Sequence, residues 1–157
     1  MSDPRIRQID ASHIADLIRI ADETNLNHWS AASYLDELKN QHSIMFRLES
    51  EANETIGFIG GRVIAAPDDD VSVDAEIYNI GVDADKQGRG LGQCLLDAFT
   101  AACLQRQVRS IWLEVRESNA SAIHVYQRNG YEKVTVRKDF YTDPREDGIL
   151  MRRQLSR

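Results

Sequence analysis

The sequence predicts a single α/β domain, residues 1–157, whose mixed, mainly antiparallel sheet is flanked by helices. Three observations support this prediction. The length of 157 residues suits one hydrophobic core, and contents of 42% hydrophobic and 28% charged residues are typical of a globular protein. Segments with the period of a strand alternate with segments that have the period of a helix. A loop with three glycines, Gly88, Gly90 and Gly92, joins an apolar strand to an apolar helix.

The composition narrows the classes of function. The net charge is −6, with 19 lysines and arginines, which argues against nonspecific binding to nucleic acid and suits a cationic substrate. No apolar run has the length of a membrane span, and the N-terminus lacks an apolar signal region, so we expect a cytoplasmic location and no membrane contact. An acidic cluster can attract a cationic substrate, although a solvated loop is the simpler interpretation; its members are Asp68, Asp69, Asp70, Asp74 and Glu76.

The chain begins with a predicted strand and a predicted helix. The strand covers residues 5–9, and Asp10 or Ser12 can cap the helix that follows. The apolar positions of this helix have the helical period and are expected to pack on the sheet: Ile14, Leu17, Ile18 and Ala21.

A second helix is predicted to begin at Ser30. Trp29 before the cap and Tyr34 in the first turns are placed to form a hydrophobic staple. Trp29 is also a candidate for lining a substrate groove between the two helices.

Three strands follow the second helix. Residues 43–49 and 55–65 are predicted to form a hairpin around a polar turn, and residues 75–82 form a third strand. These strands are expected to be antiparallel neighbours.

The glycine loop has the features of a phosphate-binding site. It lies at a helix N-terminus, where unpaired N–H groups and the positive end of the helix dipole meet, and glycines let the backbone approach phosphate oxygens. A Walker loop would need Gly-Lys-Ser/Thr, and a dinucleotide fold would need GxGxxG with an acidic residue about 20 positions on. Here the third glycine comes one residue too early, and Val108 stands at the acidic position. The loop predicts another pyrophosphate ligand, unless the glycines serve only a tight turn.

The helix after this loop is predicted to end near Arg106. Its apolar side consists of Leu91, Leu95, Ala98, Phe99 and Ala102. Cys94 and Cys103 lie on opposite faces, roughly 13 Å apart along the axis, which excludes a disulfide between them. The histidines lack metal-ligand spacing, so no metal site is expected from His13, His28, His42 or His124.

The next strand, residues 110–115, is expected to run parallel to the strand at 75–82 because a helix joins them. Its residues alternate, with Ile111, Leu113 and Val115 on one face and Trp112 and Glu114 on the other. Glu114 is therefore a single carboxylate on a largely apolar strand.

The C-terminal part predicts one helix and a closing hairpin. Asn119 can cap the helix, and residues 129–130 provide its C-terminal stop. Strands over residues 131–140 and 148–154 are expected to enclose a polar loop at 141–147.

Two parts of the sequence resemble the Gcn5-related N-acetyltransferases (GNAT). Gln87, Gly90 and Gly92 match the QxxGxG acetyl-coenzyme A signature of that family. A second block resembles the RimI-type branch, the ribosomal-protein alanine N-acetyltransferases: Leu113-Glu114-Val115-Arg116-Glu117-Ser118-Asn119, Ala122-Ile123, Tyr126 and Gly130-Tyr131. Residues 75–80 and 145–151 agree with this branch, and the order and spacing match from about Trp29 to Met151.

The resemblance implies a sheet that is splayed between the strands ending at Val82 and Val115, so that it admits acetyl-coenzyme A. The backbone of residues 80–82 would hold the pantetheine and the thioester carbonyl in the way that the edge of a sheet pairs with an added strand. The implied coenzyme contacts are Ile80, Gly81, Val82, Gln87, Gly88, Arg89, Gly90, Leu91, Gly92, Gln93 and Asn119. Gly81 and Gly148 stand where the family usually has alanine, and Gly81 is expected to loosen its strand.

The resemblance also implies Glu114 as general base and Tyr126 as general acid. An N-terminal amine has a pKa near 8, against roughly 10.4 for lysine, so it is easier to deprotonate at neutral pH by more than a hundredfold. A tyrosine with a pKa near 10 can protonate a thiolate with a pKa near 8.5 for about 2 kcal/mol. Without the resemblance, Glu114 can simply pair with Arg116 or a lysine, and Tyr126 can be part of the core. Tyr141 is a candidate for covering a peptide substrate.

The implied function is transfer of acetyl from acetyl-coenzyme A to a protein N-terminal amine by direct attack, without a metal. The implied acceptor is the N-terminal alanine of a small-subunit ribosomal protein. Two alternatives stay open: acetylation of a small amine such as a polyamine or aminoglycoside, and a non-catalytic acetyl-coenzyme A-binding regulatory module.

Overall fold

A computed structural model describes residues 5–24, 26, 29–65 and 73–155, and over these residues the chain forms one seven-stranded sheet in the order β1-β2-β3-β4-β5-β7-β6. The strands are β1 (Arg5–Arg7), β2 (Ser43–Glu49), β3 (Thr55–Ala65), β4 (Val73–Val82), β5 (Val108–Arg116), β6 (Glu132–Thr142) and β7 (Arg145–Gln154). The α-helices are α1 (Ile14–Glu23), α2 (Ala31–Lys39), α3 (Leu91–Gln105) and α4 (Ala120–Arg128). Only β4 and β5 pair in parallel among these strands, which confirms the predicted mixed, mainly antiparallel sheet.

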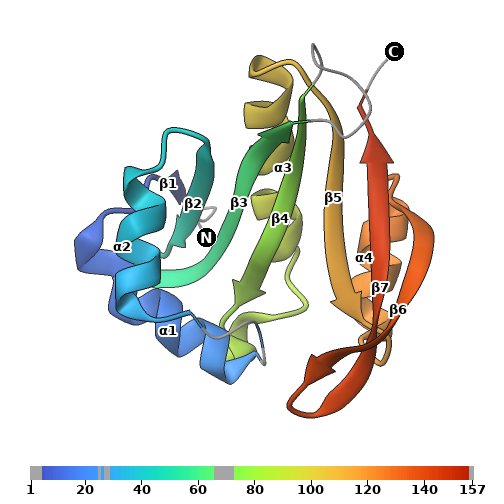
Figure 1. The fold of residues 1–157 in the computed structure, drawn as a ribbon. Coiled ribbons are helices and arrows are strands. Elements are labelled where there is room, and N and C mark those ends of the chain that lie inside the picture. Colours follow the sequence, from blue (N-terminus) through green and yellow to red (C-terminus); the bar gives the residue numbers. More distant parts are fainter. Residues whose placement is uncertain (1–4, 25, 27–28, 66–72, 156–157) are drawn as a thin grey trace.

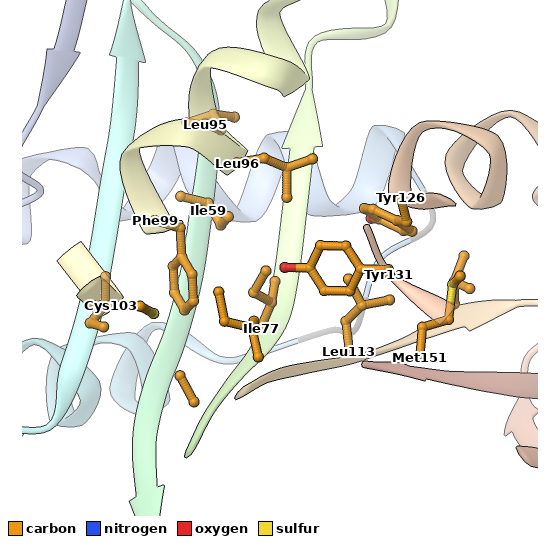
Figure 2. Close-up of a cluster of buried hydrophobic side chains, with 14 of the residues drawn as sticks. Ile59, Ile77, Leu95, Leu96, Phe99, Cys103, Leu113, Tyr126, Tyr131 and Met151 are labelled. Carbon is orange, nitrogen blue, oxygen red and sulfur yellow. The ribbon is translucent and has the colours of Figure 1, made fainter. Parts of the chain in front are cut away.

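The helices cover the two faces of the sheet in pairs. Figure 1 shows α1 and α2 in front of the β2–β4 part of the sheet, α3 behind β3 and β4, and α4 behind β5 and β7. The larger apolar cluster lies on the α3 and α4 side, where Phe99 of α3 and Tyr131 are fully buried against the sheet (Figure 2). A smaller cluster joins α1 to the other face through Leu17, Ile20 and Phe58. None of the helices in the described residues is long and apolar enough to cross a membrane.

The predicted helix starts are confirmed. Asp10 accepts a hydrogen bond from the N–H of Ser12 at 2.8 Å and caps a short 3-10 turn that leads into α1. Ser30 caps α2, and the rings of Trp29 and Tyr34 lie 5.4 Å apart between centroids, as a hydrophobic staple requires. Both cysteines are free.

Several strand ends differ from the prediction. β1 ends at Arg7, and β5 begins earlier, at Val108. The prediction of a polar loop over residues 141–147 is wrong, because β7 begins at Arg145 and only residues 143–144 separate it from β6. β6 is an edge strand whose residues are almost all exposed, including the apolar side chains of Val134, Val136 and Phe140. Residues 68–70 of the acidic cluster and His28 lie outside the described residues.

The packing around Gly61 leaves no room for a side chain, so a substitution there should change the stability of the fold. A Cβ there would lie 2.3 Å from the carbonyl oxygen of Glu76 and 2.5 Å from Phe99, beside the β-bulge between β3 and β4. Gly61→Ala is expected to lower the free energy of unfolding by about 2–3 kcal/mol, because it overpacks the core against fixed backbone. The matched control is Gly60→Ala, whose Cβ would meet its nearest atom at 3.5 Å. Denaturant unfolding of both variants tests this, and equal midpoints would contradict it.

Candidate functional site

The sheet opens between β4 and β5. Their parallel pairing ends at Ile77 and Leu113, while β4 continues to Val82 and pairs there only with β3 among the described strands. Figure 1 shows the two strands separating toward their C-terminal ends. The backbone of residues 78–82 therefore presents one free edge, to which an extended ligand can add like a further strand. The predicted splay is confirmed.

The glycine loop presents backbone to open space at the end of this edge. Gly88 and Gly90 have φ values of +80° and +79°, which favour glycine, and the Nε2 of Gln87 donates to the carbonyl of Val82 at 3.1 Å. Gly90 is the N-cap of α3, and no described side chain caps this helix. A Cβ added at Gly88, Gly90 or Gly92 would meet no atom within 4 Å. The N–H groups at the start of α3 are thus accessible to an anion such as a pyrophosphate.

Because the space around Gly92 is open, a substitution there can change coenzyme binding without lowering stability. Gly92→Leu is expected to weaken acetyl-coenzyme A binding by more than tenfold, because the new side chain fills space that phosphate groups would need. The same change places a better helix former in the first turn of α3 and should not lower the melting temperature. Calorimetric titration and thermal unfolding measure the two effects. Ala101→Leu, on an exposed part of the same helix, is the control, and an unchanged affinity of Gly92→Leu would contradict the assignment.

Glu114 lies on β5 with its side chain only 19% exposed. Its Oε1 is 3.4 Å from the Nε of Arg137, and its buried Oε2 accepts no hydrogen bond from the described residues. Burial raises the pKa of Glu114; Arg137 opposes this shift and Glu76 adds to it. Pairing with Arg116 is not observed, since Arg116 pairs with Glu146 at 3.3 Å. A carboxylate with a raised pKa and an unused oxygen is suited to accept a proton near neutral pH.

Glu114 lines a pocket of about 180 Å³ at the opening between the strands. The lining residues are Glu76, Ile77, Tyr78, Glu114, Phe140 and Tyr141. Two carboxylates and three aromatic rings suit a small cationic group, which the carboxylates attract and the ring faces accommodate.

Tyr126 lies on the other side of the sheet from Glu114. It is 8% exposed, belongs to the cluster under α3 and α4, and its ring centroid is 5.8 Å from that of Tyr131 (Figure 2). Burial raises the pKa of Tyr126, so proton donation costs more than the about 2 kcal/mol expected for an ordinary tyrosine. Burial also raises the pKa of a leaving thiolate, which narrows the difference between this pKa and that of Tyr126. A reaction that uses both Glu114 and Tyr126 must therefore take place in the opening between β4 and β5.

The two candidate substrate residues have different positions. Tyr141 lines the pocket from β6, rather than from a loop, with the Cζ of Arg116 at 4.3 Å from its ring centroid. Burial raises the pKa of Tyr141 to about 12, and the charge of Glu114 contributes. Trp29 stacks on Tyr78 at 4.8 Å between centroids, so it supports the pocket wall from behind.

Asn119 and Gly81 have clear structural roles. The Oδ1 of Asn119 accepts the N–H of Ala122 at 3.2 Å and caps α4, while its coenzyme contact stays a prediction. A Cβ at Gly81 would lie 2.9 Å from Leu26 and 3.1 Å from Thr24. Gly81 therefore lets the end of α1 pack closely on β4, which opposes the expected loosening of that strand.

The residues that hold Tyr78 were not predicted from the sequence. The hydroxyl of Tyr78 donates to the carboxylate of Glu37 and contacts the carbonyl of Gly61 at 3.1 Å. Burial pushes the pKa of Glu37 up, but hydrogen bonds from Arg62, Ser43 and Tyr78 outweigh it and lower this pKa. The alternation of β4 was a usable signal, because it places Glu76 and Tyr78 on the face that Glu114 shares.

The site can be compared with known proteins. Residues 14–131 match the family model described as the acetyltransferase (GNAT) family. The ribosomal protein bS18-alanine N-acetyltransferase of Escherichia coli (strain K12) is 45% identical over 80 residues, which make up 50% of this chain and 54% of that protein. The match thus spans about half the length of that relative. The protein of the same name from Haemophilus influenzae is 31% identical over 149 residues, 93% of this chain and 95% of that protein.

Solved structures show the same fold. The ribosomal-protein-S18-alanine N-acetyltransferase from Escherichia coli superposes with a TM-score of 0.84 and 29% identity, covering 99% of this chain and 96% of that chain. Arabidopsis thaliana NAA60 in complex with acetyl-CoA superposes with a TM-score of 0.87 over 98% of this chain and 99% of that chain. Its identity of 17% shows a shared fold alone.

Proposed function

Because the chain belongs to the acetyltransferase (GNAT) family, we propose that it transfers acetyl from acetyl-coenzyme A to the N-terminal amine of a protein. The proposed acceptor is the N-terminal alanine of ribosomal protein bS18, on which relatives are named as acting. The observation that carries the proposal is the half-buried Glu114 carboxylate, which has an unused oxygen and lines a pocket at the opening of the sheet.

The coenzyme would be held by backbone groups. The free edge of β4 at Ile80 and Val82 is suited to pair with the pantetheine, and the first N–H groups of α3 are suited to bind the pyrophosphate. Acetyl-coenzyme A supplies the activated acetyl group as a thioester. Extended binding along β4 directs the acyl end of such a ligand toward Glu114 on one side and Tyr126 on the other.

The proposed reaction moves two protons off the attacking nitrogen and one onto the leaving thiolate. Glu114 accepts a proton from the acceptor's ammonium group, directly or through a water, so that the neutral amine can attack the thioester carbonyl. The new C–N bond forms as the C–S bond breaks, and Tyr126 donates its phenolic proton to the leaving thiolate. The attacking nitrogen then carries one proton more than the amide product, and this second proton passes through water to the Tyr126 phenolate, which restores the phenol. The lower pKa of an N-terminal amine, near 8 against roughly 10.4 for lysine, favours this acceptor at neutral pH.

Mass spectrometry of acetylated products tests the proposal. The protein and acetyl-coenzyme A are mixed with a hexapeptide that begins with alanine, the same peptide with a blocked N-terminus and an internal lysine, a polyamine and an aminoglycoside. Acetylation of the alanine α-amine is expected. Acetylation of only the small amines would show that the acceptor is a small amine and not a protein N-terminus. Coenzyme binding without any acetylated product would favour a regulatory module.

A further inference from the structure

A second carboxylate lies beside Glu114. Glu76 on β4 is paired with Trp112 on β5, and Glu114 comes two residues after Trp112. Strand alternation places the side chains of Glu76 and Glu114 on one face, with Cα atoms on the order of 8 Å apart from strand spacing and rise. Both side chains line the same pocket.

Glu76 has no structural role that explains its position. It is exposed, and among the described residues it forms no hydrogen bond or ion pair. The preceding acid on this face behaves differently, because Asp74 is fully buried, accepts the Nε1–H of Trp112 at 2.9 Å and lies 3.5 Å from Arg109. A like charge next to Glu114 is unfavourable unless a cation is shared between the two carboxylates.

Arg137 is the cation that the protein itself brings to this place. It reaches over from β6, is 51% exposed, and contacts only one oxygen of Glu114, at 3.4 Å. Its Cζ lies 5.8 Å from the ring centroid of Phe140, which also lines the pocket. An exposed ion pair of this kind is weak and can be exchanged for another cation.

We propose that Glu76 is an acceptor-binding residue: its carboxylate and that of Glu114 together receive the acceptor's ammonium group, which replaces the Arg137 guanidinium at Glu114. This inference rests on the proposed function and names the group that selects a cationic acceptor. Once Glu114 has taken the proton and the amide has formed, the product carries no charge at this nitrogen. It therefore loses its attraction to Glu76, and Arg137 returns to Glu114 once that carboxyl group has released its proton to solvent.

Binding and kinetics of Glu76→Gln test the inference. With a hexapeptide that begins with alanine, KM is expected to rise about fivefold, as for loss of one partly exposed ion pair. The fall in kcat should be smaller than this rise in KM. Glu76→Gln should also bind the free peptide and its N-acetylated form with more similar affinities than the wild type does. Arg137→Gln should lower KM, because it removes the competing cation. Glu54→Gln, in the exposed turn between β2 and β3, is the charge-matched control and should behave like the wild type.

The pH profile supplies a readout that a purely structural role would not move. Among the described residues, the charged or titratable groups that share the pocket with Glu114 or shift its pKa are Glu76 and Tyr78 on β4 and Arg137 and Tyr141 on β6. Glu76 raises the pKa of Glu114 and Arg137 lowers it. The acid limb of kcat/KM should therefore move to lower pH in Glu76→Gln and to higher pH in Arg137→Gln.

The outcomes separate the two proposals. A wild-type protein that acetylates no N-terminal amine would overturn the proposed function. An active wild type, together with a Glu76→Gln variant whose KM, peptide preference and acid limb are all unchanged, would overturn the inference on Glu76 alone.

Discussion

Glu114→Gln is expected to lower kcat/KM for acetyl transfer to an alanine peptide by about 10²- to 10⁴-fold, the usual contribution of a positioned general base. Glutamine has nearly the same shape but accepts no proton at neutral pH, and Glu114 is the carboxylate whose raised pKa and unused oxygen suit this task. Coenzyme affinity should change little, because the glycine loop and the start of α3, which would hold the pyrophosphate, contribute no residue to the pocket of Glu114. Steady-state kinetics and calorimetric titration measure the two quantities.

The pH dependence shows whether the loss is chemical. In the wild type, kcat/KM should rise with pH through the raised pKa of Glu114, above the usual value of 4.5, and Glu114→Gln should lack this limb. A raised carboxyl pKa means that the folded protein holds the proton more tightly than the unfolded chain does. The contribution of Glu114 to stability therefore falls as pH rises from 4.5 through its folded pKa. At pH 7 the glutamine variant should be no less stable than the wild type, and equal activity of both at every pH would exclude the base role.

Tyr126→Phe is expected to slow the chemical step about 10²-fold, within the range of a general acid. Phenylalanine keeps the ring that packs against Tyr131 and removes only the hydroxyl that would protonate the thiolate. Because burial raises the pKa of Tyr126, the wild type should show no loss of activity from its ionisation below about pH 10. Single-turnover kinetics at saturating coenzyme measure the step directly.

A neighbouring tyrosine provides the control for this variant. Tyr131 is 2% exposed, its hydroxyl has no hydrogen-bond partner among the described residues, and its ring also contacts Tyr126. Tyr131→Phe should therefore be fully active and at least as stable as the wild type. Equal rates for Tyr126→Phe and Tyr131→Phe would remove the acid assignment.

The parts of the fold that depend on local pattern could be predicted from the sequence. A glycine loop between an apolar strand and an apolar helix predicts a βαβ connection, and the parallel pairing of β4 and β5 confirms it. Alternation in β5 placed Ile111, Leu113 and Val115 in the core, where all three are buried. These features need only neighbouring residues and the period of a strand or helix.

The features that depend on strand order could not be predicted in this way. The Arg137 partner of Glu114 follows from the order β5-β7-β6, which brings an exposed edge strand to the pocket. The contact of Tyr78 with Glu37 joins β4 to α2, two elements that are far apart in the sequence. A strand over residues 131–140 is predicted from the sequence, but β6 ends only at Thr142, and this last part becomes visible only through its pairing with β7.

A crystal structure with coenzyme A linked covalently to the N-terminal nitrogen of an alanine peptide tests the proposed geometry most directly. The linked nitrogen should lie in the pocket within hydrogen-bond reach of Glu114, directly or through one water, with the sulfur near the Tyr126 hydroxyl and the pyrophosphate on the first N–H groups of α3. A peptide bound elsewhere, or a coenzyme that avoids the opening between β4 and β5, would contradict acyl transfer at this site.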